Sequence, residues 1–155
     1  MTLRPAALAL VLSALVLGLA VGCPRSKSAS PRVSTLTATG HRIVIEVNDD
    51  GAERWEGILN NVDNLQKAFS ADPPQIDVVA HAKGLGLLLA SNEALKARMQ
   101  AEHDSGVVFA ACENTMTKQH IAKTQLMPFV TTVDSGVAEI VRKQEAGWAY
   151  LKGGG

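Results

Sequence analysis

Short apolar segments alternate with amphipathic segments from residue 41 onward, and this alternation is the strongest constraint on the fold. Five segments have the apolar or β-branched character of strands, at residues 42–47, 76–80, 107–111, 129–133 and 148–151. Between them, apolar residues recur at helical spacing, which predicts helices at residues 52–69, 92–103 and 115–126 and a last one between Ser135 and Gly147. We therefore expect residues 41–155 to form an α/β domain, a three-layer flavodoxin-like sandwich with a mainly parallel sheet of about five strands.

Two details of these helices follow from the same pattern. Asp49 or Asp50 is available as the N-cap of the first helix, because both precede it directly. The apolar residues of the last helix should form one buried face, made of Val137, Ile140 and Val141.

Polar side chains follow the first three predicted strands at their carboxyl ends. They are Asn48 after the first strand, His81 and Lys83 after the second, and Cys112, Asn114 and Thr115 after the third. Ligands of parallel α/β sheets bind at this edge, so we expect these residues to converge. Cys112, His81 and Lys83 are the candidate catalytic residues, and the amides and hydroxyl of the others are candidate ligand-binding groups.

Cys112 lies where a strand meets a helix, and two interpretations of it are open. Free N–H groups at the start of a helix stabilise a thiolate, and His81 or Lys83 would add to this effect. A cysteine that ends an apolar strand is also a common buried, structural residue. No second cysteine lies nearby, which excludes a dithiol mechanism.

The residues around this cysteine carry a family resemblance. The segments FAACENTM (109–116), VDSGVAEIVRKQ (133–144) and GWAYL (147–151) resemble the DsrE/DsrF-like family, and the similarity extends through the opening strand and Val78–His81. The resemblance implies a parallel α/β sandwich that assembles into trimers or hexamers. It also implies sulfur carriage, because the best-understood members hold sulfur as a cysteine persulfide, and Cys112 matches the position of their cysteine.

Two functions from different classes follow. In the first, Cys112 is the persulfide carrier of a sulfurtransferase-like protein, His81 or Lys83 stabilises the anion, and the partners are a sulfur donor and acceptor. In the second, the protein is a non-catalytic lipoprotein module that binds a small ligand or a protein, and Cys112 is structural.

The N-terminus has the plan of an export signal. Residues 1–22 contain one charge, Arg4, followed by an apolar run that ends in small residues. The alternative is a membrane-spanning or buried helix, but a span needs about 20 apolar residues, and this run is shorter and contains Ser13 and Gly18. We expect residues 1–22 to be a removable signal peptide.

A lipid attachment site is predicted at Cys23. The stretch Leu19 to Cys23 resembles a bacterial lipobox, although Ala20 stands where leucine is commoner; the alternative is a free Cys23 thiol after ordinary cleavage. Residues 23–40 are rich in proline, serine and threonine, which predicts a flexible tether behind the lipidated cysteine. We thus expect an exported protein, lipid-anchored on the periplasmic side of a bacterial membrane, and Pro24 favours the outer one.

Composition removes other classes of function. Fifteen basic and fifteen acidic residues give no electrostatic excess for nucleic acid. The Gly84-Leu85-Gly86 segment lacks the lysine of a phosphate loop and the third glycine of a dinucleotide site. No histidine pair has metal-ligand spacing, and His120, in the middle of a predicted helix, is most simply a surface residue. We expect no metal and no cofactor.

Overall fold

One five-stranded sheet forms the centre of the domain. In the computed structural model, which describes residues 40–153, the strand order is β4-β3-β2-β1-β5 and every neighbouring pair is parallel. The strands are β1 Arg42–Val47, β2 Gln75–Ala80, β3 Val108–Cys112, β4 Thr131–Val133 and β5 Ala149–Lys152. The predicted parallel sheet is therefore confirmed.

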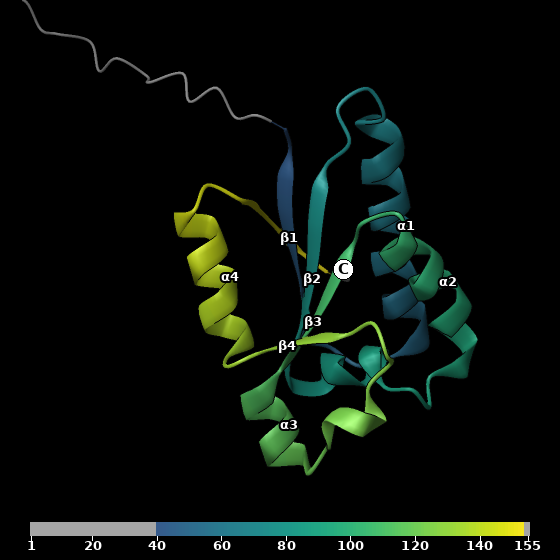
Figure 1. Ribbon diagram of the computed structural model, residues 1–155, viewed down its shortest axis with the longest axis vertical. Helices are drawn as coiled ribbons and strands as arrows, with labels where there is room; N and C mark the ends of the chain where they lie inside the picture. The colour runs from purple at the N-terminus through teal and green to yellow at the C-terminus, as the bar shows by residue number, and fades with distance from the viewer. Residues whose placement is uncertain (1–39, 154–155) are drawn as a thin grey trace, which may run out of the picture. The chain divides into compact units, whose positions relative to one another are not determined.

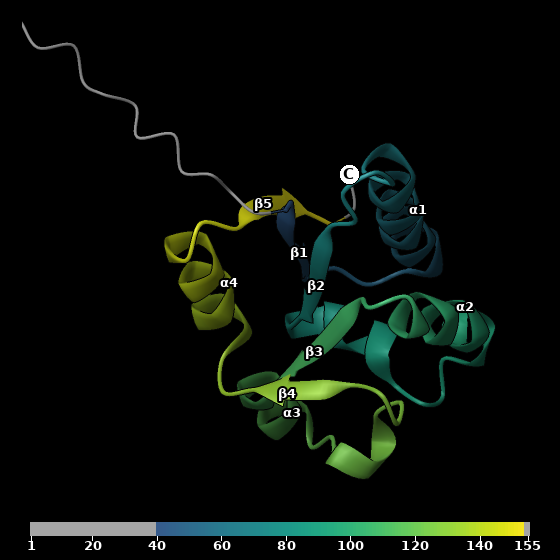
Figure 2. The same cartoon turned by 45° about the horizontal axis from the view of Figure 1, so that its top comes forward.

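Helices lie on both faces of this sheet. They are α1 Ala52–Ala68, α2 Glu93–Asp104, α3 Glu113–Gln119 and α4 Gly136–Glu145, with 3₁₀ turns η1 Ala82–Leu88 and η2 Lys123–Gln125. Helices α1 and α2 cover one face and α4 the other, whereas α3 lies beyond the carboxyl ends of the strands (Figure 1). Turned by 45°, the domain shows β5 at the edge beside β1 (Figure 2). The three-layer α/β sandwich is confirmed.

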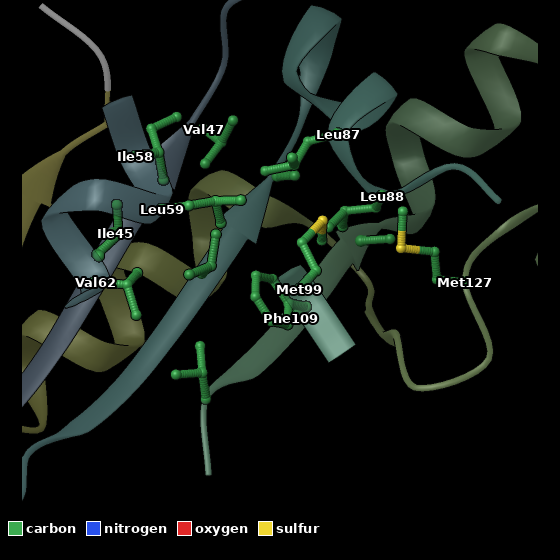
Figure 3. Packing of buried hydrophobic residues seen from close by; sticks show 14 of the residues in the cluster. Ile45, Val47, Ile58, Leu59, Val62, Leu87, Leu88, Met99, Phe109 and Met127 are labelled. Carbon is green, nitrogen blue, oxygen red and sulfur yellow. The ribbon is translucent and has the colours of Figure 1, made fainter. Parts of the chain in front are cut away.

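The core is divided by the sheet into two unequal parts. Successive residues of a strand face opposite sides of the sheet, so Ile43, Ile45 and Val47 all pack toward α1 and α2. Figure 3 shows this larger cluster, in which Phe109 and Met99 meet the leucines of η1. The α4 side has a small cluster instead, made of Val44, Val79, Ala110 and Ile140.

The third predicted helix is shorter than expected. Helix α3 ends at Gln119, and His120 adopts a left-handed conformation with φ 56°. The N–H of Ile121 closes the turn on the Met116 carbonyl at 2.9 Å. Met116, Ile121 and Leu126 are five residues apart, a spacing that does not keep them on one helix face, which explains why the helix does not continue to residue 126. The placement of His120 in the middle of a helix was wrong.

Two further expectations about helices are corrected. Gly51, not Asp49 or Asp50, is at the N-cap of α1, and no side chain caps this helix; Asp49 forms an ion pair with Arg54 at 3.1 Å instead. Of the expected face of α4, only Ile140 is buried, while Val137 and Val141 are 57% and 46% exposed. The small cluster on this side of the sheet includes Ile140 and neither valine. The Ser135 cap was correct, since its side chain accepts a hydrogen bond from the Ala138 N–H.

Residues before Gly40 lie outside this description. The predicted signal peptide 1–22, the lipidation of Cys23 and the tether 23–40 therefore stay predictions. Among the residues that are described, no helix combines the length and the apolar character that a membrane crossing requires.

Helix α2 contains a buried carboxyl group without a hydrogen bond. Glu102 is 4% exposed, and neither of its side-chain oxygens has a hydrogen-bond partner among the described residues. Arg98 Nε lies 3.3 Å from Oε1, so the guanidinium offers charge without hydrogen-bond geometry. Burial raises the pKa of Glu102 to about 7, against the opposing effect of Arg98.

Glu102→Gln should stabilise the domain above neutral pH. A folded-state pKa above the unfolded value means that ionisation costs stability, so the wild type loses stability as pH rises from the unfolded pKa to about 7. The full cost is about 3 kcal/mol at pH 8, and the amide avoids it. Urea unfolding of both proteins at pH 4 and pH 8 measures this. Equal differences in unfolding free energy at the two pH values would contradict the assignment.

Candidate functional site

Cys112 is the last residue of β3, at the carboxyl edge of the sheet. It directly precedes α3, and its extended backbone turns the chain into that helix. Only 4% of the residue is exposed. The sequence prediction placed it correctly at the strand-to-helix junction.

Polar groups around the Cys112 sulfur favour its charged form. Burial raises the pKa of the thiol, but the Thr115 hydroxyl and the backbone N–H groups of Gly136, Thr115 and Asn114 together lower it below its ordinary value. These donors come from α3 and from the first residue of α4. A thiolate is the nucleophilic form of cysteine, so the site favours the reactive state.

Gly136, the first residue of α4, lets the start of this helix lie close to the edge of the sheet. A Cβ at this position would be 3.1 Å from His81 Cβ, 3.5 Å from His81 Cδ2 and 3.2 Å from Cys112 Cβ. His81, which directly follows β2, and Cys112, the last residue of β3, therefore lie next to the same glycine.

His81 is held by a carboxylate that the sequence analysis did not select. Its Nε2 lies 2.8 Å from Glu46 Oε1, and the two side chains are only 14% and 16% exposed. Glu46 also accepts a hydrogen bond from the Tyr150 hydroxyl on its Oε2 and one from Asn48 Nδ2 at 3.4 Å. Burial opposes the charge of Glu46, yet its hydrogen bonds to Tyr150 and His81 lower its pKa overall. The hydrogen bond to Glu46 in turn raises the pKa of Tyr150 to about 12.

Lys83 lines a cavity between the turn η1 and helix α3. The cavity has a volume of about 390 Å³, and its walls are formed by His81, Ala82, Lys83, Thr115, Lys118 and Gln119. Thr115 connects it with the site, because its Oγ1 accepts from the Ala82 N–H at 3.1 Å and the same hydroxyl lowers the pKa of the Cys112 thiol. Lys83 and Lys118 therefore bring two ammonium groups to a cavity that Thr115 also lines.

The other predicted site residues have mixed outcomes. The Asn48 side chain donates to Glu46, whereas the Asn114 backbone N–H donates to the Asp134 carbonyl oxygen at 3.3 Å and the Asn114 side chain is exposed. Gly84 has a packing role, because a Cβ there would be 2.2 Å from the Val47 carbonyl oxygen. Within residues 40–153, no group of three or more His, Cys, Asp or Glu side chains could hold a metal ion.

Glu46 and Gly136 are the site residues that sequence reasoning missed. Glu46 did leave a signal, since it is a charged residue inside an apolar strand whose neighbours are Ile45 and Val47. Gly136 left none, because its role depends on how closely α4 approaches the sheet.

Comparisons with known proteins agree with this architecture. The sequence model of the DsrE/DsrF-like family matches residues 20–152. A solved structure of a protein of unknown function from Methanobacterium thermoautotrophicum is 32% identical, with a TM-score of 0.69 over 72% of this chain and 98% of that one. A second, from Bacteroides thetaiotaomicron and also of unknown function, is 14% identical with a TM-score of 0.56, over 72% and 93% of the two chains, and it shares the fold. A comparison with curated proteins gave no match.

Thr115→Val should raise the pKa of Cys112. It removes the side-chain donor to the sulfur, a hydrogen bond to a charged group, so alkylation of Cys112 by iodoacetamide at pH 7 should slow about tenfold. Rates measured between pH 6 and pH 10 give the pKa directly. Thr115→Ser keeps the hydroxyl and is the matched control, expected to react like the wild type. Equal pH profiles for the valine and serine variants would show that the hydroxyl does not stabilise the thiolate.

Proposed function

Because the chain belongs to the DsrE/DsrF-like family, we propose that it acts in a sulfur relay and carries sulfane sulfur as a persulfide on Cys112. The observation that carries the proposal is the position of Cys112 where β3 meets α3 and Gly136 of α4, in surroundings that lower the pKa of its thiol. The same surroundings suit a persulfide anion, whose negative charge lies on the terminal sulfur next to Sγ.

The transfer needs no external oxidant. The Cys112 thiolate attacks the outer sulfur of thiosulfate, the new S–S bond forms as the old one breaks, and sulfite leaves with the electron pair. Cys112 then holds the persulfide. An acceptor thiolate attacks its terminal sulfur, takes that sulfur away and regenerates the Cys112 thiolate. A polysulfide donor reacts in the same way and leaves as a shorter polysulfide.

His81 and Lys83 support this chemistry through charge. Both line the cavity that Thr115 shares with the thiol, and Lys118 adds a second ammonium group there. Cations beside the site favour anionic donors and the anionic persulfide. Lys83 is exposed, so its contribution is screened by solvent, whereas His81 is mostly buried.

The small exposed area of Cys112 favours a second function. A cysteine that is 4% exposed also fits a packed, structural residue in a non-catalytic module that binds a small ligand or a protein. The two functions differ in whether the native thiol reacts.

Intact-mass measurement of the 41–155 domain after incubation with thiosulfate or polysulfide should show one added sulfur atom. Cys112 is the only cysteine of this segment, so the adduct must be absent from Cys112→Ala. Dithiothreitol should remove the added sulfur, because a thiol accepts the terminal sulfur of a persulfide. If no donor gives an adduct and the native thiol also resists alkylation, Cys112 is structural and the binding module is the better function.

We also propose a homo-oligomer, a trimer or a hexamer. Val137 and Val141 on α4 and Tyr150 on β5 are exposed apolar side chains beside an edge strand. Burying them between copies would remove apolar area from water and protect the strand edge.

Sedimentation velocity should show the wild type larger than a monomer. Val141→Glu places a charge in the exposed apolar group and should shift the population toward monomer. Ala97→Glu, at an exposed position on α2 across the sheet, is the control and should keep the wild-type sedimentation coefficient. A monomeric wild type at high protein concentration would contradict the proposal.

A further inference from the structure

Glu46, His81 and Cys112 lie on one side of the sheet. Each lies two positions after a residue of the small cluster that faces α4, and residues two apart in a strand face the same side of the sheet. The three cluster residues are Val44, Val79 and Ala110. The carboxylate, the imidazole and the thiol come from three adjacent strands or the residue that follows one. The positions of the three side chains are therefore set by the order of the strands in the sheet.

The hydrogen bond between Glu46 and His81 fixes the proton of the imidazole. A carboxylate of lowered pKa is ionised at neutral pH and has no proton to donate. At 2.8 Å, Nε2 must therefore carry the hydrogen, and Nδ1 is the nitrogen that gains or loses a proton. The ring is also restrained in rotation, because one of its nitrogens is committed to a side chain that Tyr150 holds in place.

Other charges around this pair are few. From β5, Tyr150 donates to Glu46 and Lys152 acts on it through space. From the η1 and α3 side, Lys83 and Lys118 line the cavity next to His81. The residue of α4 that contacts the ring is Gly136, which brings no charge. Glu46 is thus the anion that directly bonds the imidazole.

We propose that Glu46 is a positioning residue that acts on Cys112 through His81. It keeps the proton on Nε2 and the ring beside the thiol, so that Nδ1 takes up the proton that Cys112 gives up. The resulting imidazolium then lies between two anions, the thiolate and the Glu46 carboxylate. The inference rests on the proposed function only in that Cys112 reacts as a nucleophile.

If Glu46 acted directly on the thiol, its removal would change the alkylation rate in the opposite direction from an effect through His81. The negative charge of Glu46 repels a thiolate, so removing it would by itself lower the Cys112 pKa and speed alkylation. An effect that passes through His81 removes support from the thiolate and slows alkylation. The sign of the change in rate therefore separates the two.

The test compares the pH dependence of Cys112 alkylation by iodoacetamide in the wild type, Glu46→Gln, His81→Ala and the double variant. Asp49→Asn is the matched control, because it also removes one carboxylate charge just after β1, where Asp49 pairs with Arg54, and leaves the hydrogen bond between Glu46 and His81 intact. We expect Glu46→Gln and His81→Ala each to slow alkylation at pH 7 about tenfold, the double variant to be no slower than His81→Ala, and the control to stay within about twofold of the wild type. Tryptophan fluorescence confirms that each variant is folded.

The ¹⁵N shifts of the His81 ring give a second readout that packing alone would not move. The wild type should show the Nε2–H form, and Glu46→Gln a mixture of both forms, because a glutamine side chain can donate as well as accept. Faster alkylation in Glu46→Gln, or a further slowing when it is added to His81→Ala, would overturn the inference. Alkylation by iodoacetamide does not depend on a persulfide. If the alkylation rates are as expected but no donor loads sulfur onto Cys112, the sulfur-carrier function is contradicted and the role of Glu46 is not.

Discussion

The close contact between the start of α4 and the carboxyl edge of the sheet is the interaction on which the site depends. A methyl group at Gly136 would be 3.1 Å from His81 Cβ and 3.2 Å from Cys112 Cβ, so both neighbours would have to move slightly to admit it. With glycine there, the backbone N–H of residue 136 helps to lower the pKa of the thiol, and Ile140 of α4 packs against Val44, Val79 and Ala110. The same contact that completes the third layer of the fold thus supplies a donor to the thiol.

Strand order explains why three separated segments meet there. Because β1, β2 and β3 are neighbours and parallel, Glu46, His81 and Cys112 arrive at one edge from positions far apart in the sequence. The loops after these strands add Thr115 and Lys83. The thiol has a nearby imidazole, polar groups that lower its pKa and little exposed area.

The sequence predicted the architecture well because strand and helix periods are local properties. The bounds of β1 were correct, and Cys112 was placed at its junction. Errors arose where tertiary contact decides: a helix pattern cannot tell that, of its three apolar side chains, α4 buries Ile140 and leaves Val137 and Val141 exposed. The role of Gly136 and the pairing of Glu46 with His81 depend on strand order and helix approach, neither of which is encoded in a local pattern.

The position of β5 has a kinetic consequence. This edge strand pairs with β1, and its Tyr150 bonds to Glu46 across 104 residues of chain. Closing so long a loop is entropically costly, and domains rich in such distant contacts fold slowly. The carboxylate that orients the imidazole therefore acquires its full set of partners only after nearly the whole domain has come together, so the environment of the thiol is a late product of folding.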